Sequence, residues 1–177
     1  DCLFHSRFLV SDENQENWHQ RGEIYSAPGC LEPSIVQLPR GDILCYMRYG
    51  ARGGGHIWRS ISSDEGQSFS PPELTTLRNP HSGIDIALST TGRLLITYND
   101  SYYLRTPVCI GVSDDYGKTW RVRDIEFDVG EYSYPKLIQT SDGLWHIFYT
   151  HNRTHIQHGW FDEEWLENRR KVIGLRN

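Results

Sequence analysis

Hydrophobic residues along this chain fall into short runs that alternate with polar residues and end at turn-forming residues. Alternation with a period of two, bounded by glycine, proline or aspartate, is typical of β-strands joined by tight turns. The runs that fit this pattern cover residues 3–10, 18–25, 33–38, 43–48, 57–61, 84–88, 94–98, 108–112, 121–125, 135–140, 145–150 and 156–161. We therefore expect an all-β fold.

Two segments call for a separate interpretation. The strand that follows residues 62–69 is expected to end at Pro71 and Pro72, because proline cannot donate a hydrogen bond within a sheet. Residues 163–171 break the strand pattern and predict a short helical tail.

One eight-residue motif recurs between the predicted strands. Residues 113–120 read Ser-Asp-Asp-Tyr-Gly-Lys-Thr-Trp and fit the pattern Ser-x-Asp-x-Gly-x-Thr-Trp, which predicts a hairpin loop. The aspartate can accept hydrogen bonds from backbone N–H groups of its own loop, while Trp120 packs beneath it. Residues 62–69 are a second copy with Phe69 in the aromatic position, and residues 11–18 are a degenerate third that keeps a serine, an acid and Trp18.

The spacing of these boxes is uniform. From 11 to 62 and from 62 to 113 the distance is 51 residues, and Gly41, Gly92 and Gly143, which each end a turn, keep the same spacing. A period near fifty with several short strands per unit predicts the blades of a β-propeller. The 177 residues hold about three and a half such repeats. We therefore expect residues 1–177 to form one partial propeller domain, with about three four-stranded antiparallel blades, half of a six-bladed ring.

Composition and charge narrow the classes of partner. The hydrophobic fraction of 37% is enough for a core, and no apolar run is long enough to span a bilayer. A net charge of -5 with scattered basic residues argues against nucleic acid and against an anionic membrane surface. The chain begins at Asp1 with neither an initiator methionine nor a signal peptide, so we expect a trimmed N-terminus. The compartment, cytoplasmic or secreted in a bacterium, is left open.

The cysteines and histidines lack metal-ligand spacing, so we expect neither a metal site nor a cofactor. The four cysteines are interpreted as free thiols, although whether Cys30 and Cys45 on neighbouring strands form a disulfide is left open. They are Cys2, Cys30, Cys45 and Cys109.

Equivalent positions of the three repeats carry unlike residues where the innermost strands begin. Glu32, Gly83 and Tyr134 are again spaced by 51 residues. Unlike polar residues at one scaffold position indicate a site at the central channel. A glutamate beside a tyrosine can take the phenol proton and make the phenol a nucleophile. Arg48 ends one strand and Arg105 precedes another, and two guanidiniums facing one channel favour a bound carboxylate.

Each of these residues also has an ordinary structural interpretation. Tyr134 could simply pack against its neighbours, as strand tyrosines usually do. Arg48 and Arg105 could form ion pairs with Asp85 or Asp100. The combination of all four residues favours a site.

Together these features resemble the C-terminal half of a sialidase, and most of all the bacterial predicted neuraminidases with Asp-box (BNR) repeats. The resemblance is carried by the boxes, by residues 32–38 and 46–48, by Arg105 ahead of its strand, and by residues 132–135. It implies a six-bladed propeller that hydrolyses terminal sialic acid or a related acidic sugar with retention, through a tyrosine nucleophile.

The resemblance also assigns roles to individual residues. Tyr134 matches the nucleophile and Glu32 the carboxylate that activates it, while Arg48 and Arg105 match two of the three arginines that hold the sugar carboxylate. Asn99 and Asp85 lie near the channel end of the middle repeat and are candidate substrate contacts.

Two elements of the sialidase pattern have no match in this chain, namely the first carboxylate-binding arginine and the acid/base aspartate of the N-terminal blades. The resemblance therefore implies a glycoside hydrolase only if the missing half or a second copy completes the ring, and a homodimer with a two-fold axis would do so. The alternative is a non-catalytic propeller module that binds carbohydrate or protein.

Overall fold

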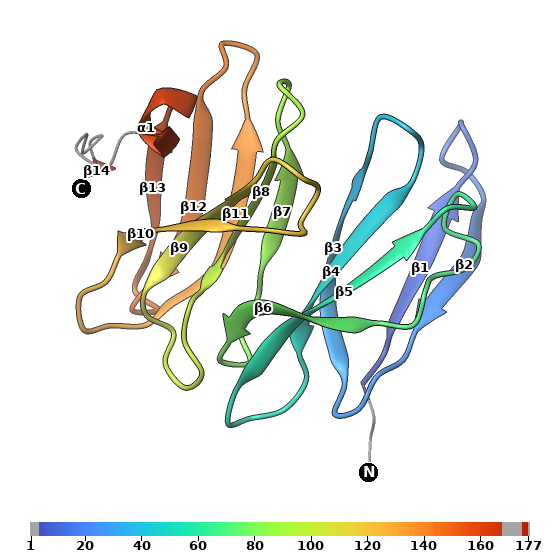
Figure 1. Cartoon of the computed structure of the whole chain (residues 1–177), viewed down its shortest axis with the longest axis horizontal. Helices are drawn as coiled ribbons and strands as arrows, with labels where there is room; N and C mark the ends of the chain where they lie inside the picture. Colours follow the sequence, from blue (N-terminus) through green and yellow to red (C-terminus); the bar gives the residue numbers. More distant parts are fainter. Residues whose placement is uncertain (1–3, 168–174, 177) are drawn as a thin grey trace.

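The computed structural model describes residues 4–167 and 175–176, and apart from one short helix their regular secondary structure is β-strand (Figure 1). They form one two-stranded sheet and three four-stranded antiparallel sheets. The first sheet holds β1 (Ser6–Ser11) and β2 (Trp18–Ile24), and the second holds β3 (Cys30–Gln37), β4 (Ile43–Tyr49), β5 (Gly55–Ser62) and β6 (Glu73–Asn79). The third holds β7 (Asp85–Leu88), β8 (Leu94–Asn99), β9 (Val108–Ser113) and β10 (Arg121–Glu126), and the fourth holds β11 (Tyr132–Gln139), β12 (Trp145–His151), β13 (His155–Phe161) and β14 (Leu175–Arg176). The all-β class and the four-stranded antiparallel blades are confirmed.

Two predicted boundaries change. The strand after residues 62–69 does not end at Pro71 and Pro72, because β6 begins directly after them. A proline that cannot donate to the ladder fits just before a strand as well as after one. The helix α1 spans Glu163–Glu167, and the remainder of the predicted helical segment lies outside the described residues.

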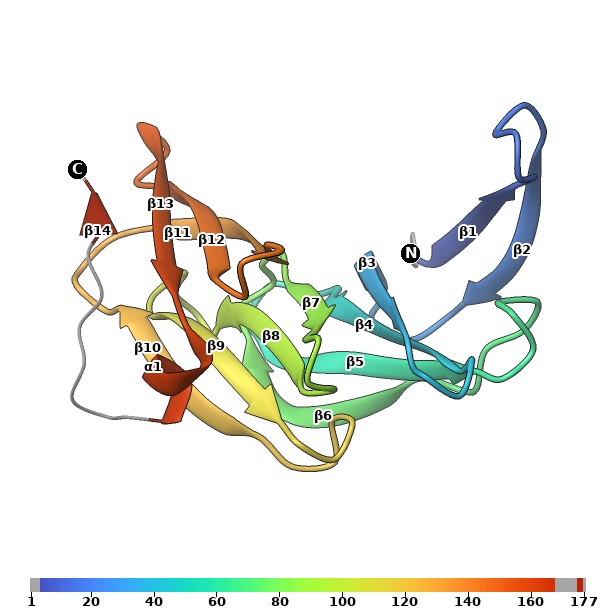
Figure 2. The same ribbon diagram turned by 90° about the horizontal axis from the view of Figure 1, so that it is seen from above.

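Each sheet packs face to face against the next, and the sheets follow one another around an open arc (Figure 2). Three apolar clusters fill the spaces between them. One joins β1–β2 to the second sheet, one joins the second sheet to the third, and one joins the third to β11–β13 and Trp165. Residues such as Tyr46, Leu94 and Trp145 are completely buried there. Each large apolar side chain so buried contributes about 1.5–3 kcal/mol, so face-to-face packing holds the blades together.

The box at residues 113–120 closes its own loop as predicted. The carboxylate of Asp115 accepts the backbone N–H groups of Lys118 (3.0 Å) and Thr119 (2.9 Å) and the Thr119 hydroxyl (2.7 Å). The hydroxyl of Ser113 donates to Asp115 (2.7 Å) and accepts the N–H of Gly117 (2.8 Å). The loop is therefore held by contacts between residues at most a few positions apart.

The same bonds recur in residues 62–69. Asp64 accepts the hydroxyl of Ser68 (2.5 Å), its backbone N–H (2.9 Å) and the hydroxyl of Ser62 (2.8 Å). The hydrogen bonds from Ser68 and then from Ser62 lower the pKa of Asp64 to about 2, because they favour the carboxylate.

The boxes also attach each hairpin to the preceding sheet. The ring of Trp120 stands at 90° to Tyr46 of β4, with ring centroids 5.9 Å apart, and Phe69 stacks on Phe8 of β1 at 4.5 Å. Gly117 has φ +87° and approaches the Tyr46 hydroxyl so closely that no side chain would fit there. The motif thus serves both the loop and the contact between blades.

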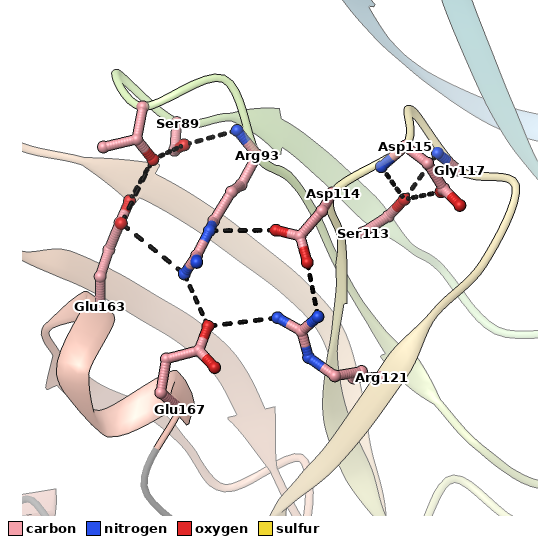
Figure 3. Close-up of polar contacts among 10 residues, drawn as sticks. Ser89, Arg93, Ser113, Asp114, Asp115, Gly117, Arg121, Glu163 and Glu167 are labelled. Carbon is pink, nitrogen blue, oxygen red and sulfur yellow. Dashed lines mark hydrogen bonds and ion pairs between the residues drawn. The ribbon is translucent and has the colours of Figure 1, made fainter.

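A charged network joins the box of the third sheet to helix α1 of the fourth (Figure 3). Arg93 of the β7–β8 turn contacts Asp114 (3.1 Å) and Glu167 (2.8 Å), and Arg121 contacts the same two acids. These side chains are partly exposed, so each pair contributes little energy and mainly fixes the position of α1.

Cys30, Cys45 and Cys109 are buried and free, so no disulfide joins Cys30 to Cys45. Burial raises the pKa of the Cys45 and Cys109 thiols, which keeps them unreactive. Cys2 lies outside the described residues. Within the described part of the chain, no helix is long and apolar enough to cross a membrane.

We expect the Asp64→Asn substitution to lower the melting temperature at pH 7. Because the folded pKa of Asp64 is depressed, its stabilisation is complete above the unfolded pKa of about 3.9 and is lost as the pH falls through about 2. The difference in melting temperature between wild type and variant should therefore shrink from pH 5 to pH 3, measured by circular dichroism. Glu65→Gln, at an exposed position of the same loop, is the control; an equal and pH-independent effect of both variants would contradict the prediction.

Candidate functional site

Glu32, Gly83 and Tyr134 meet at the start of the three innermost strands, β3, β7 and β11, which lie side by side. A Cβ atom placed on Gly83 would lie 3.1 Å from Oε2 of Glu32 and 3.1 Å from Cδ1 of Tyr134. The missing side chain at position 83 thus leaves the space into which the carboxylate and the phenol ring both project. A small pocket of about 180 Å³ lies there, lined by these three residues and by Pro33, Ile84, Pro135 and Lys136.

The backbone at both Glu32 and Tyr134 is strained in the same way. Their φ angles are +48° and +52°, in the left-handed region that residues with a Cβ avoid. The strand pairing of β3 with β4 and of β11 with β12 shifts at these positions, so each residue lies in a bulge that aims its side chain out of the ladder. Strain of this kind concentrates at functional sites.

Arg48 fixes the orientation of Glu32. It lies on β4, opposite Leu31 of β3, and its Nη1 donates to Oε1 of Glu32 at 2.5 Å. Arg48 is only 8% exposed whereas the Glu32 side chain is 43% exposed, so the ion pair is shielded from water on the arginine side only. With Oε1 bound to Arg48, Oε2 is the oxygen that faces Gly83 and Tyr134.

Arg105 lies on the other side of the tyrosine. Its guanidinium carbon is 5.4 Å from the centre of the Tyr134 ring, within the range of a cation–π contact. Its Nη1 donates to the Ser133 hydroxyl (3.0 Å) and lies 3.4 Å from Oε1 of Glu131. Within the described part of the chain, the Tyr134 hydroxyl makes no hydrogen bond, and the side chain is 51% exposed. The phenol is therefore open to a ligand.

Asp85, a candidate substrate contact from sequence, connects the three inner strands. Its carboxylate accepts the Ser34 hydroxyl of β3 (2.9 Å), and from β11 the Lys136 ammonium (3.0 Å) and the Leu137 N–H (3.0 Å). Ser34, Asp85 and Lys136 are again equivalent positions of the repeats. With its side chain only 14% exposed, Asp85 holds β3 and β11 beside β7.

Asn99, the other candidate substrate contact, is completely buried. Its amide nitrogen donates to the carbonyls of Pro107 (3.1 Å) and Tyr132 (2.9 Å), and its oxygen accepts the Ser82 hydroxyl (2.8 Å). Asn99 thus joins the segments that carry Gly83, Arg105 and Tyr134, and in this structure it positions the site without lining it.

Sequence reasoning missed Asn79 and Ser82, which support the same segment. The Asn79 side chain donates to the Ser82 carbonyl (3.0 Å) and accepts the N–H groups of Ser82 (3.2 Å) and Tyr49 (3.3 Å). Asn79 therefore joins Ser82, which precedes Gly83, to Tyr49 at the end of β4, next to Arg48. An asparagine at the end of a strand before an irregular loop is a weak sequence signal for such a role.

A larger groove of about 910 Å³ lies elsewhere, between β2 and the loop at residues 67–69. It is open and lined mostly by exposed side chains, because β1 and β2 form only a two-stranded sheet. The smaller pocket at Gly83 is the better candidate, since the strained backbone and the paired charges converge on it.

Comparisons with known proteins agree with this architecture. Residues 3–147 match the family model of the BNR repeat-like domain. An intramolecular trans-sialidase from Ruminococcus gnavus superposes with a TM-score of 0.71 at 18% identity, over 92% of this chain. A Hadza microbial sialidase gives 0.73 at 21% identity over 88% of this chain. An α-L-arabinanase from Penicillium chrysogenum gives 0.59 at 16% identity over 90%. No curated protein sequence matches the chain.

The structural similarity confirms the sialidase-type blades expected from the boxes. It covers only part of each of the matched structures. The chain spans 39% of the R. gnavus structure, 32% of the Hadza microbial sialidase and 51% of the arabinanase.

The strained backbone at position 32 predicts an unusual order of stability. Glu32→Gly should be more stable than Glu32→Ala by about 1 kcal/mol, because both lose the contact to Arg48 but only glycine is at ease at φ +48°. Urea unfolding of the two variants measures the difference. Gln37 is an exposed β3 position without a positive φ, so there the alanine variant should be more stable than the glycine variant. If the two variants had the same order of stability at positions 32 and 37, the backbone strain at position 32 would be refuted.

Proposed function

The chain belongs to the BNR repeat-like domain family, and from this premise we propose that it supplies the nucleophile half of a sialidase-like exo-glycosidase. The reaction is hydrolysis of a terminal sialic acid or a related acidic sugar with retention of configuration. The convergence of Glu32 and Tyr134 on Gly83, with both polar residues in strained conformations, is the observation that carries the proposal.

In the proposed mechanism Tyr134 is the nucleophile. Glu32, oriented by Arg48, takes the phenol proton through Oε2 as the tyrosine oxygen attacks the anomeric carbon. The bond to the leaving oxygen breaks, and a glycosyl-tyrosine forms with inverted configuration. Water then attacks the same carbon and gives its proton to the group that had protonated the leaving oxygen. The tyrosine oxygen leaves and recovers its proton from Glu32, and the second inversion restores the configuration.

Arg105 binds the sugar carboxylate in this scheme. It is held by Ser133 and Glu131 and by the Tyr134 ring, so its guanidinium is already oriented before the substrate arrives. An oriented guanidinium matches the two oxygens of a carboxylate and loses little entropy on binding. Arg48 adds positive charge but is bound to Glu32.

Protonation of the leaving oxygen requires an acid, and the resemblance to sialidases assigns this role to an aspartate of N-terminal blades that have no match in this chain. The chain spans less than half of the sialidase structures that it matches. We propose that another part of the polypeptide or a second copy of this chain supplies the acid and closes the arc.

A non-catalytic, carbohydrate-binding module is the second candidate. It is favoured by one observation: within the described part of the chain, the Tyr134 hydroxyl has no hydrogen bond to Glu32 or to any other group. Such a module would bind an acidic monosaccharide through Arg105 without turning it over.

We expect Tyr134→Phe to abolish turnover of the 4-methylumbelliferyl glycoside of N-acetylneuraminic acid, measured by fluorescence, since the variant lacks the nucleophilic oxygen. Glu32→Gln should lower kcat by about 10²–10⁴-fold, because a general base is lost. Tyr116→Phe, at an exposed tyrosine of the box loop, is the control. Turnover by Tyr134→Phe equal to that of wild type would overturn the mechanism. No turnover by the wild-type chain once the arc is closed by the other part of the polypeptide or by a second copy, with binding retained, would favour the non-catalytic module.

We expect Gly83→Val to lower kcat by about 10²-fold while the melting temperature changes little. The new side chain would occupy the space between Oε2 of Glu32 and the ring of Tyr134 and separate them. Turnover and thermal unfolding of the same preparation give both quantities. Gly143→Val, at an open turn with φ +85°, is a control in which stability but not kcat should fall. An unchanged kcat in Gly83→Val would contradict the proposal that Glu32 and Tyr134 act together across the space at Gly83.

A further inference from the structure

The turn between β12 and β13 is attached to the segment that precedes β11. The Asn152 N–H donates to the Glu131 carbonyl and the Asn152 side-chain oxygen accepts the Glu131 N–H, both at 2.8 Å. A Cβ atom on Gly130 would lie only 2.8 Å from the same oxygen, so glycine is needed for this approach. The turn is therefore fixed relative to Glu131 by backbone contacts.

Arg153 extends from this turn to the acid that also contacts Arg105. Its Nε donates to Oε1 of Glu131 at 2.8 Å, and the same oxygen accepts Ser133 (3.0 Å) and lies 3.4 Å from Arg105. Burial alone would raise the pKa of Glu131, but the hydrogen bonds from Arg153 and Ser133 and the charges of both arginines lower it, so Glu131 is a carboxylate. One oxygen atom thus aligns two guanidiniums.

The charges around this oxygen do not cancel. Two guanidiniums and one carboxylate leave one net positive charge beside Tyr134, whereas the pair of Arg48 and Glu32 is neutral. The Arg153 side chain is 71% exposed, and its two Nη groups form no hydrogen bond or ion pair with any described residue. They are available to a ligand.

The turn itself does not require an arginine. Position 153 has φ +56°, a conformation that glycine adopts without strain, and the attachment to Glu131 is made by Asn152. The backbone of the turn therefore does not explain why position 153 is an arginine.

We propose that Arg153 is a specificity-determining residue that, together with Arg105, binds the anionic group of the substrate, with Glu131 holding both guanidiniums in place. This inference rests on the proposed function, because it concerns the same site. The ligand class is a sugar with a carboxylate, and the preference for the ionised form over a neutral derivative is the property that Arg153 supplies.

The test compares binding of N-acetylneuraminic acid with binding of its methyl ester, which lacks the negative charge, by isothermal titration at low salt. Arg153→Gln should weaken binding of the acid about threefold to tenfold and leave the ester unchanged, since one charged hydrogen bond is lost at a partly exposed position. Arg153→Lys keeps the positive charge but lacks the paired N–H donors of a guanidinium, so its affinity for the acid should lie between those of wild type and Arg153→Gln. Arg40→Gln, an exposed arginine in the turn at the far end of β3, is the matched control and should change neither affinity.

The Glu131→Gln background separates direct from indirect action. If Arg153 acts on the ligand itself, Arg153→Gln weakens binding of the acid in that background too. If the effect vanishes there, Arg153 acts only by neutralising Glu131 and the inference is overturned. Thermal melting of each variant confirms that the fold is retained.

The outcome for the wild type keeps the two proposals apart. A wild-type chain that prefers the acid to the ester, with an Arg153→Gln variant that keeps the full preference, overturns the role of Arg153 and leaves the proposed function standing. A wild-type chain without any preference for the acid overturns both.

Discussion

The second and third sheets each bury both faces against their neighbours, and face-to-face packing of successive sheets is the constraint on which the site depends. Three apolar clusters hold the sheets in order, and the shape of the arc brings β3, β7 and β11 together at its inner side. Asp85 then joins those strands by hydrogen bonds to both neighbours. Residues far apart in sequence, such as Glu32 and Tyr134, meet because the scaffold repeats, and the repeat places the same strand position of each blade at the same inner edge.

Several departures from ordinary strand structure come together at the site. Two residues with large side chains occupy left-handed backbone conformations, and a glycine stands between them where the repeat allows a side chain. Buried asparagines, Asn79 and Asn99, satisfy the backbone groups that these irregular segments leave unpaired. Such local conflicts, supported by a rigid surrounding, are typical of functional positions, where strain is tolerated because the scaffold over-determines it.

Electrostatics at the site differ from those of the whole chain. The net charge is -5, yet in the ion pairs formed by Glu32 and Glu131 three arginines, Arg48, Arg105 and Arg153, face two acids. Charges beyond about 8 Å are screened at physiological salt, so the local excess decides which ligand is favoured and the overall charge does not. An anionic sugar is compatible with an acidic protein for this reason.

The sequence by itself determined the all-β class, the blade repeat and the closure of the boxes, and it singled out Glu32, Arg48, Arg105 and Tyr134 as candidate site residues. These follow from local patterns: alternation sets strands, Asp115 bonds residues a few positions away, and a period of 51 residues aligns the repeats. Only the tertiary structure decided that Gly83 leaves room for the side chains of Glu32 and Tyr134, that Asn99 is buried, and that Arg153 shares Glu131 with Arg105. Those relations depend on distances between segments from different blades, and no local pattern encodes such distances, because they are set by how the sheets pack.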